Sequence, residues 1–514
     1  MTQATRHPGG EYFDTRTIAS RNLTRARSAA TVASMSDALP EDDILALPLR
    51  QGWRDRLRLR RPFRLPSQRA TADNIITAPT PLKPIDLTDD AEVAQVLDLA
   101  VRVGEVVLAA GTGVTDTSAQ VRFIASTYGL DSCDIDVTFD AIRIWADRGP
   151  RLPPASDMRV VTYRSLDFTR LAAVDRLTRR IRTLAVPVDQ AHAALDEIIA
   201  VRHPYPRWVS TLGWSLLAAS IAVLLGGGLL VVAVSFAATA VIDVVNRGLN
   251  HLGLPMFFQH MVGGVLAAAP AIALAAVGTQ RADAALIVAA GITVLLSGQQ
   301  LVGSVQDAIT GAPITAAARM LEVVMMTGGI VAGIGLALRF ATVLGLAVPG
   351  IGTAVGRDIE NLPVKLLAGA AAAMAFVLAC YAERRAVFSA GLSGAGGTLV
   401  YLVAQDFGFG PVTSSGMAAI LIGLAGGLLA RRALTPPLVV AVAGITPLLP
   451  GLKVYRGLYA LLHDELVLGL GQVLGAFGVG CALAAGVILG EWFDRLLARR
   501  GAPRAFDPAY TGEN

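Results

Sequence analysis

The sequence predicts a polytopic α-helical membrane protein, with about ten transmembrane helices as two inverted five-helix repeats and an N-terminal cytoplasmic α+β domain. Three observations support this fold class. Hydrophobic residues make up 53% of the chain, and long apolar runs fill it from about residue 208 to residue 493. A run of roughly 20 apolar residues can cross a bilayer as a helix. A short element recurs in both halves of this block, and the region before the block has the mixed periodicity of a soluble domain.

Residues 1–87 are predicted to form a disordered tail, because they are rich in Arg, Ser, Thr, Ala and Pro and lack apolar periodicity. Residues 50–69 within the tail hold eight arginines around Trp53 and Phe63. This cluster has two interpretations, binding to nucleic acid and attraction to anionic lipid headgroups. We favour the lipid headgroups and expect no nucleic-acid partner. The N-terminus lacks the apolar core of a signal peptide, so we expect it to stay in the cytoplasm.

Residues 88–205 are predicted to form the cytoplasmic α+β domain. Acidic residues precede an amphipathic helix that Gly111 ends, and alternating apolar and polar residues then indicate a strand or hairpin. The expected elements are helices over 91–111 and 118–128, a strand or hairpin over 135–145, a strand over 158–163, and helices over 166–183 and 188–201.

Ten apolar runs follow, and each is long enough for a transmembrane helix. Five belong to a first repeat, 206–340, and five to a second repeat, 364–493, with an extracytoplasmic connection over 341–363. An odd number of spans per repeat inverts the second repeat in the bilayer. We expect the protein in the cell (inner or plasma) membrane. The Arg-rich N-terminal region and the tail over 494–514 indicate that both termini lie in the cytoplasm. The expected spans lie near 208–225, 228–246, 256–277, 284–302, 319–338, 364–382, 386–403, 412–430, 436–452 and 469–492.

The repeated element reads GITVLLSG over 291–298 and GITPLLPG over 444–451, identical at six of eight positions. Proline and glycine free backbone groups from helical pairing, and such groups at membrane depth must face protein or a wet cavity. We therefore expect a substrate pathway here, with close helix packing by small residues as the alternative. The loop after the first element, which holds Asp307, should open to the cytoplasm. The loop after the second element, which holds Lys453, should open to the outside. The pathway candidates are Thr293, Ser297, Gln299, Gln300, Asp307, Thr446, Pro450 and Lys453.

Two ionisable residues in the apolar spans are candidates for proton coupling. Asp243 lies late in the second span, where the sequence suggests no fixed cation on its apolar side, and His260 lies near the start of the third. Ionisable groups within spans are costly to bury and often functional. The alternative is that both are solvated helix ends near the cytoplasmic surface, and this alternative is favoured for Glu322.

No cofactor or metal is expected. Cys133, Cys380 and Cys481 are widely spaced, and they form neither a disulfide framework nor a CxxC metal motif. The glycine-bearing segment 111–118 lacks the lysine and the spacing of a phosphate-binding loop, so it is interpreted as a polar loop that caps the next helix.

Several segments together resemble the threonine/serine exporter family over roughly residues 88–493. They are AAGTGVTDTSAQVRFIASTYGL and IDVTFDAIRIW in the soluble part, then GITVLLSGQQLVGSVQDAITG and AGITPLLPGLKVYRGLYALL in the two membrane halves. The resemblance implies export of threonine and serine driven by the proton motive force. Ser297 replaces a proline of the family pattern. Gln120 replaces an acidic residue, which argues against hydrolase activity.

We therefore predict a secondary active exporter of small neutral amino acids, by proton antiport, and not an enzyme. Its expected partners are the amino acid, protons and anionic membrane lipids, and the oligomeric state stays open. Two alternatives remain. One is a membrane-tethered hydrolase acting through the α+β domain, for which His192 with Ser165 is the only loose candidate pair. The other is a regulatory sensor domain that gates a transporter.

Overall fold

The computed structural model describes residues 84–162, 166–276, 281–295, 298–346, 361–433, 435–462 and 465–500. All of them belong to one compact unit, Arg69–Asn514. The predictions for the Arg-rich tail up to residue 83, for Ser165 and Ser297, and for the chain after residue 500 lie outside the described residues.

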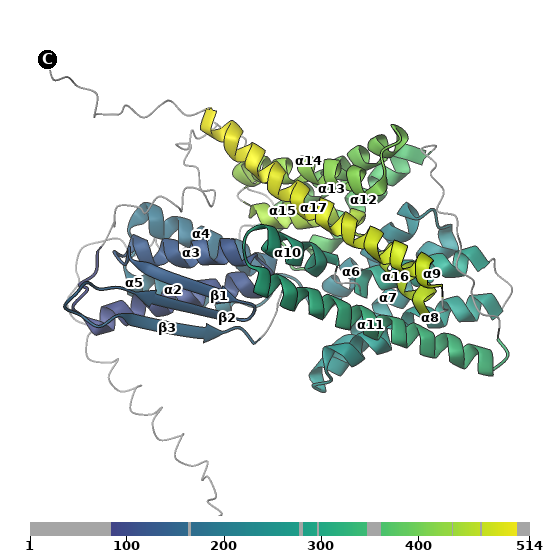
Figure 1. Ribbon diagram of the computed structural model, residues 1–514, viewed down its shortest axis with the longest axis horizontal. Helices are drawn as coiled ribbons and strands as arrows, with labels where there is room; N and C mark the ends of the chain where they lie inside the picture. The colour runs from purple at the N-terminus through teal and green to yellow at the C-terminus, as the bar shows by residue number, and fades with distance from the viewer. Residues whose placement is uncertain are drawn as a thin grey trace, which may run out of the picture. The chain divides into compact units, whose positions relative to one another are not determined.

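The N-terminal region, residues 84–200, combines helices with a three-stranded antiparallel sheet of order β1-β2-β3 (Figure 1). The predicted helices, the hairpin and the third strand are present, but the second helix begins four residues earlier than predicted and the third strand spans 155–160 instead of 158–163. The elements are α2 (Asp90–Ala109), α3 (Val114–Thr127), β1 (Cys133–Thr138), β2 (Ala141–Ala146), β3 (Ala155–Val160), α4 (Phe168–Leu184) and α5 (Val188–Ala200).

Local sequence explains these elements. The Asp89 side chain accepts a hydrogen bond from the Ala91 amide and so caps α2. After α2 the chain turns at Gly111, whose φ of 89° lies in the left-handed region that favours glycine. In β2, Ile142 and Ile144 are fully buried while the residues between them face outward. This alternation places one face of the hairpin on α2 and α3.

Eight helices of the described chain are long and apolar enough to cross a membrane, which agrees with a polytopic helical membrane protein. They match eight of the ten predicted spans. In Figure 1 they run from α6 to the long C-terminal α17. They are α6 (Arg207–Leu224), α7 (Leu229–His251), α8 (Met256–Ala276), α11 (Pro313–Val343), α12 (Leu362–Ala379), α13 (Arg384–Asp406), α14 (Pro411–Ala433) and α17 (Leu466–Arg500).

The other two predicted spans, 284–302 and 436–452, each correspond to more than one element of the structure, and residues 296–297 of the first lie outside the described residues. The first gives α9 (Arg281–Leu295) and α10 (Gly298–Ile309). The second gives α15 (Pro437–Ile445), the short 3-10 helix η5 (Thr446–Leu448) and α16 (Gly451–Leu462). Leu449 is extended, with ψ of 136°, because the following Pro450 disfavours helical geometry at the preceding residue. We call the junction between α9 and α10 the first helix break and the junction between α15 and α16 the second helix break.

The same helix pairings occur in both halves. In the first half α6 packs on α7, α7 on α8, α8 on α11 and α10 on α11. In the second half α12 packs on α13, α13 on α14, α14 on α17 and α16 on α17, and α6 joins the halves by packing on α12. Figure 1 shows α14 and α17 side by side in this arrangement.

Glycines explain the closest of these pairings. A Cβ on Gly329 of α11 would lie 2.6 Å from the Phe257 carbonyl oxygen, and a Cβ on Gly486 of α17 would lie 2.6 Å from the Gly416 carbonyl oxygen. In each helix a second glycine four residues later makes a closer approach still. The α8–α11 and α14–α17 contacts therefore depend on the same glycine spacing, as is common for helices packed in membranes.

The N-terminal region and the membrane helices share one hydrophobic core, which includes residues of α2, α3, α4, α6, α12, α13 and α15. Polar contacts reinforce it. The Phe168 amide donates to the Cys380 carbonyl oxygen at 3.1 Å. Arg176 forms an ion pair with Glu383 at 2.7 Å. The N-terminal region is therefore packed against the segment between α12 and α13 rather than tethered by a free linker.

Candidate functional site

The first helix break lies beside His260 of α8. The ring nitrogen Nδ1 of His260 is 2.8 Å from the Met256 carbonyl oxygen. The backbone of Leu295, the last residue of α9, is a further hydrogen-bond partner of the same ring. The structure therefore brings one proton-coupling candidate to the first break.

Four pathway candidates lie at or after this break. Thr293 belongs to α9 and Gln299 to α10, but their side chains are outside the described atoms, as is the whole of Ser297. Gln300 is half-buried in α10, and its buried Oε1 has no hydrogen-bond partner in the described structure. An unpaired buried amide oxygen carries a desolvation cost that a bound polar group would relieve.

The second helix break is tightly packed. Thr446 is buried, and its hydroxyl donates to the Val442 carbonyl oxygen at 2.8 Å, so it is already used within its own helix. Pro450 is buried and Lys453 is half-buried in α16. Gly444 sits against Ser393 of α13 so closely that a Cβ there would overlap the serine hydroxyl.

Two pairs of buried hydroxyls on the helices that contact the breaks were missed by the sequence analysis. Ser235 and Thr239 lie on α7, which packs on α9, and Ser389 and Ser393 lie on α13, which packs on α15 and η5. The second pair follows the first by 154 positions, close to the 153 that separate the repeated elements. The hydroxyls of Ser235, Thr239 and Ser393 have no partner in the described structure. The matching separation was the signal that could have identified them.

Asp307 is not in an open loop, which corrects the sequence expectation. It lies in α10 with no exposed surface and forms an ion pair with Arg319 at 2.6 Å. Its other carboxylate oxygen accepts from the Val114 amide at 3.0 Å, and Arg319 donates to the Thr112 carbonyl oxygen at 3.3 Å. Burial raises the pKa of Asp307, while Arg319 and the amide oppose that shift. Asp307 therefore binds the N-terminal region and does not face open cytoplasm.

The same contact explains the glycine-bearing segment 111–118. Its Gly113 is the N-cap of α3 but offers no side-chain hydrogen bond. Asp307 caps the helix instead, because Val114 is the first helical residue and an anion is favoured at a helix N-terminus. The prediction that this loop caps its own helix is thus corrected. The cap comes from a residue 193 positions later.

Asp243 has a cation beside it, on the side toward the C-terminal end of α7. Arg247, one helical turn later in α7, forms an ion pair with Asp243 and also binds Thr211 of α6. In the described structure no hydrogen bond or ion pair joins Asp243 to His260. The two proton-coupling candidates therefore do not form a relay by direct contact.

A cavity of about 170 Å³ lies between the N-terminal region and the membrane helices. It contains four carboxylates and three guanidinium groups, and sequence analysis missed it because these groups come from helices far apart in the chain. Burial raises the pKa of Asp116 and of Asp175 within it. The lining residues are Val107, Thr112, Asp116, Gln120, Phe123, Leu171, Asp175, Thr178, Arg179, Arg182, Gln306, Gly427, Pro436, Pro437, Leu438, Glu491, Asp494 and Arg495.

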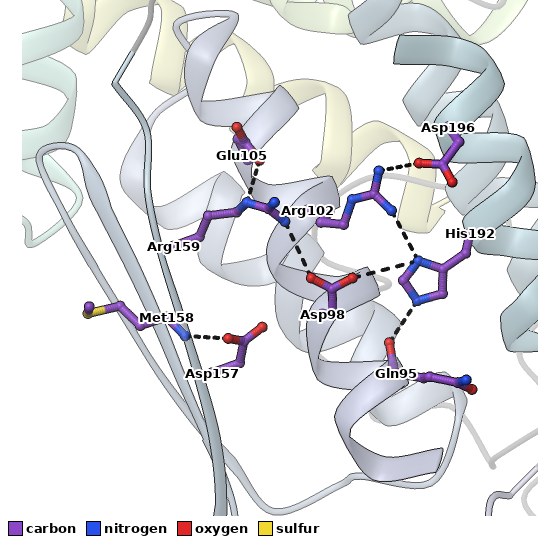
Figure 2. A network of polar contacts seen from close by, with 9 residues as sticks. All are labelled: Gln95, Asp98, Arg102, Glu105, Asp157, Met158, Arg159, His192 and Asp196. Carbon is purple, nitrogen blue, oxygen red and sulfur yellow. Dashed lines mark hydrogen bonds and ion pairs between the residues drawn. The ribbon is translucent and has the colours of Figure 1, made fainter. Parts of the chain in front are cut away.

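His192, the base of the hydrolase alternative, belongs to a structural network between α2, α5 and β3 (Figure 2). Its Nε2 is 2.9 Å from the Gln95 carbonyl oxygen, and its Nδ1 is 3.3 Å from Arg102. Arg102 in turn pairs with Asp196 of α5. Both ring nitrogens are thus engaged in joining two helices, and no nucleophile is among the residues of Figure 2.

Comparisons with known proteins agree with the resemblance seen in the sequence. A family model described as "Putative threonine/serine exporter" matches residues 98–341, and one described as "Threonine/Serine exporter, ThrE" matches residues 365–493. The "Threonine/serine exporter" of Corynebacterium glutamicum is 42% identical over 442 residues, which cover 85% of this chain and 90% of the relative. The "Probable threonine/serine exporter" of Mycobacterium tuberculosis is 40% identical over 425 residues, 82% of this chain and 80% of the relative.

No solved structure matches the chain. The matches span both membrane halves and most of the N-terminal region, and the relatives are aligned over most of their own length. The chain therefore belongs to the threonine/serine exporter family, a family of transporters and not of enzymes.

Proposed function

We propose that this protein exports small neutral amino acids, threonine and serine first, by a secondary active mechanism coupled to the proton motive force. The observation that carries the proposal is the 42% identity to a threonine/serine exporter over 85% of the chain. The repeated element and the interrupted helix at its second copy support it, because Gly/Pro-interrupted apolar segments at matching positions of two halves are typical of secondary transporters.

The transport pathway in this proposal runs along the two helix breaks. At the second break, the extended Leu449 and the prolines on either side of it leave carbonyl groups free for a polar substrate. The unpaired hydroxyls on α7 and α13 would add partners for a substrate that itself carries a hydroxyl. The proposed pathway residues are Thr293, Ser297, Gln299, Gln300, Thr446, Pro450 and Lys453, together with Ser235, Thr239 and Ser393.

The two halves form an inverted pair in this proposal, with residues 88–205 as a cytoplasmic domain and both termini in the cytoplasm. The recurring helix pairings and the matched glycines of α11 and α17 support a duplicated unit. Asp307 then acts as the joint between the first half and the cytoplasmic domain, rather than as a group that touches substrate.

His260 is the stronger candidate for proton coupling. It contacts the end of α9 at the first break, and imidazole titrates near neutral pH. Asp243 is instead held by an ion pair with Arg247 of its own helix. Protonation of His260 would change its hydrogen bonds at the break and so favour one conformation of the pathway.

The proposal is tested by efflux from cells that lack their own exporters and are loaded with peptides of threonine, serine, alanine or glycine. We expect expression of this protein to accelerate the release of threonine and serine, and an uncoupler to abolish the acceleration. Release that is unchanged for all four amino acids would defeat the proposed substrate class. Acceleration that survives the uncoupler would defeat the proton coupling alone.

A further inference from the structure

We propose that the cavity between the N-terminal region and the membrane helices is a loading site, which binds a small zwitterionic amino acid before it enters the pathway. This inference rests on the proposed function, since it names where the exported substrate first binds. Nothing in the repeated elements or in the family matches assigns a role to these residues.

The size of the cavity suits such a ligand. Its volume is about 170 Å³. An internal cavity of roughly 150 Å³ holds a benzene-sized molecule, so a small amino acid fits. The cavity therefore has room for threonine or serine.

The charges of the cavity match both ends of a zwitterion. Some of its groups already pair with each other, as Asp175 does with Arg179 at 2.6 Å. Asp116 and Arg182 line the cavity, and no ion pair or hydrogen bond joins either of them to another residue that the structure describes, although the charge of Arg495 in the same lining acts on Asp116. A half-buried acid and a half-buried base without a direct partner leave one site for an ammonium group and one for a carboxylate.

Neutral polar atoms in the cavity wall also lack hydrogen-bond partners. Thr112 is 93% buried, since only 7% of its surface is exposed, and its hydroxyl has no partner in the described chain although it lines the cavity. The Oε1 atom of Gln120 is likewise buried and unpaired. Buried polar groups are rarely left without partners, so a ligand with hydrogen-bonding groups would complete this wall.

The location connects the cavity to both helix breaks. Gln306 reaches it from α10, the helix that follows the first break. Pro436, Pro437 and Leu438 reach it from the start of α15, the helix that leads to the second break. A ligand bound here thus touches the two elements that begin or end at the proposed pathway.

Titration calorimetry on the purified full-length protein in lipid nanodiscs tests the inference. Threonine and serine are the probes. Two analogues remove one charge each: threonine methyl ester lacks the carboxylate, and 3-hydroxybutanoate lacks the ammonium. We expect both amino acids to bind and each analogue to bind about tenfold weaker or worse, because each loses one charge-assisted contact. Equal affinity of threonine and the two analogues would overturn the inference.

Variants locate the binding. Asp116→Asn and Arg182→Gln should each raise the Kd for threonine by about tenfold. The matched controls are Asp131→Asn and Arg180→Gln, which alter exposed residues outside the cavity and should leave the Kd unchanged. Unchanged affinity in both cavity variants, with the ligand-free Tm preserved, would overturn the loading site.

Efflux measured with the same variants separates this inference from the proposed function. If the wild type exports threonine and the cavity variants bind and export like it, the loading site is wrong and the function stands. If the wild type exports none of the amino acids, the proposed function itself fails. Weaker binding together with a raised KM for export in both cavity variants supports the loading site.

Discussion

The helices after the two breaks, α10 and α16, have the same length and the same place in their halves, but in the part of the chain that the structure describes the buried ion pair with Arg319 belongs to α10. Asp307 is the tenth residue of α10, and the tenth residue of α16 is Ala460. Arg319 precedes Gly329 of α11 by ten residues. Ala476 likewise precedes Gly486, the matching glycine of α17, by ten residues. The second half therefore has two buried alanines where the first has an ion pair.

This difference follows from what each half packs against. The ion pair of the first half faces the N-terminal region, where it binds the Val114 amide and the Thr112 carbonyl oxygen. In the second half the corresponding helix pair, α16 and α17, carries only small side chains at these two positions. The helix lengths and positions common to both halves thus reflect the duplication. The charged residues found at these positions in the first half alone reflect the attachment of the N-terminal region to that half.

The largest effect is expected from breaking the ion pair on one side. Arg319→Ala leaves the Asp307 carboxylate buried beside the N-terminal region without its cation, at a cost of about 3–5 kcal/mol in the free energy of unfolding. Chemical denaturation in detergent, together with proteolysis between the N-terminal region and α6, measures the loss.

The double variant Asp307→Ala/Arg319→Ala is the control, because it gives the first half the residues of the second. It should recover much of the loss, since no unpaired charge remains, although α3 loses its cap. A double variant as unstable as Arg319→Ala would show that burial of the lone carboxylate is not the cause.

The ion pair distinguishes the two halves, whereas the packing glycines of α11 and α17 should affect the stability of both halves equally. Gly329→Ala and Gly486→Ala each place a Cβ 2.6 Å from a backbone oxygen of the facing helix. We expect each to lower the free energy of unfolding by about 1–3 kcal/mol, as overpacking does. Gly328→Ala and Gly475→Ala are matched controls, since nothing lies within 4 Å of a Cβ there. A loss confined to one half would contradict equivalent packing.

Sequence analysis predicted the elements whose causes are local. The cap at Asp89, the turn at Gly111 and the alternation in β2 all act over a few residues. The second helix break was partly visible, because Pro447 and Pro450 were recognised as helix-disrupting, yet a continuous span was still predicted on apolar content.

The features that escaped prediction depend on contacts between distant segments. Asp307 accepts a hydrogen bond from Val114, 193 positions away in the sequence. This contact attaches Asp307 to the N-terminal region, whereas the sequence suggested a loop open to the cytoplasm. The cavity combines Asp116 with Glu491 and Asp494 near the other end of the chain. Asp243 is a different case, since its partner Arg247 lies only one helical turn away in the sequence.

A smaller effect, on coupling rather than on folding, is expected at His260. His260→Gln keeps a hydrogen-bonding side chain but removes titration, so export should lose its dependence on pH. Asp243→Asn should keep that dependence, because Arg247 already holds this carboxylate. The pH profile of threonine efflux from energised vesicles separates them. A profile altered by Asp243→Asn and unaltered by His260→Gln would reverse the assignment.

The smallest effect is expected from the repeated hydroxyls, and it tests whether both halves serve the pathway. Thr239→Val keeps the shape of its side chain, and Ser393→Ala removes one small group, so neither should change folding by more than about 1 kcal/mol. Each removes an unpaired hydroxyl beside a helix break and should raise the KM for serine export about three- to tenfold, with little change for alanine. Ser389→Ala is the control, because that hydroxyl donates to the Ala386 carbonyl oxygen of its own helix at 3.0 Å. If Thr239→Val raises the KM and Ser393→Ala behaves like the control, only the first half contributes hydroxyls to the substrate, and the asymmetry seen at Asp307 extends to the pathway itself.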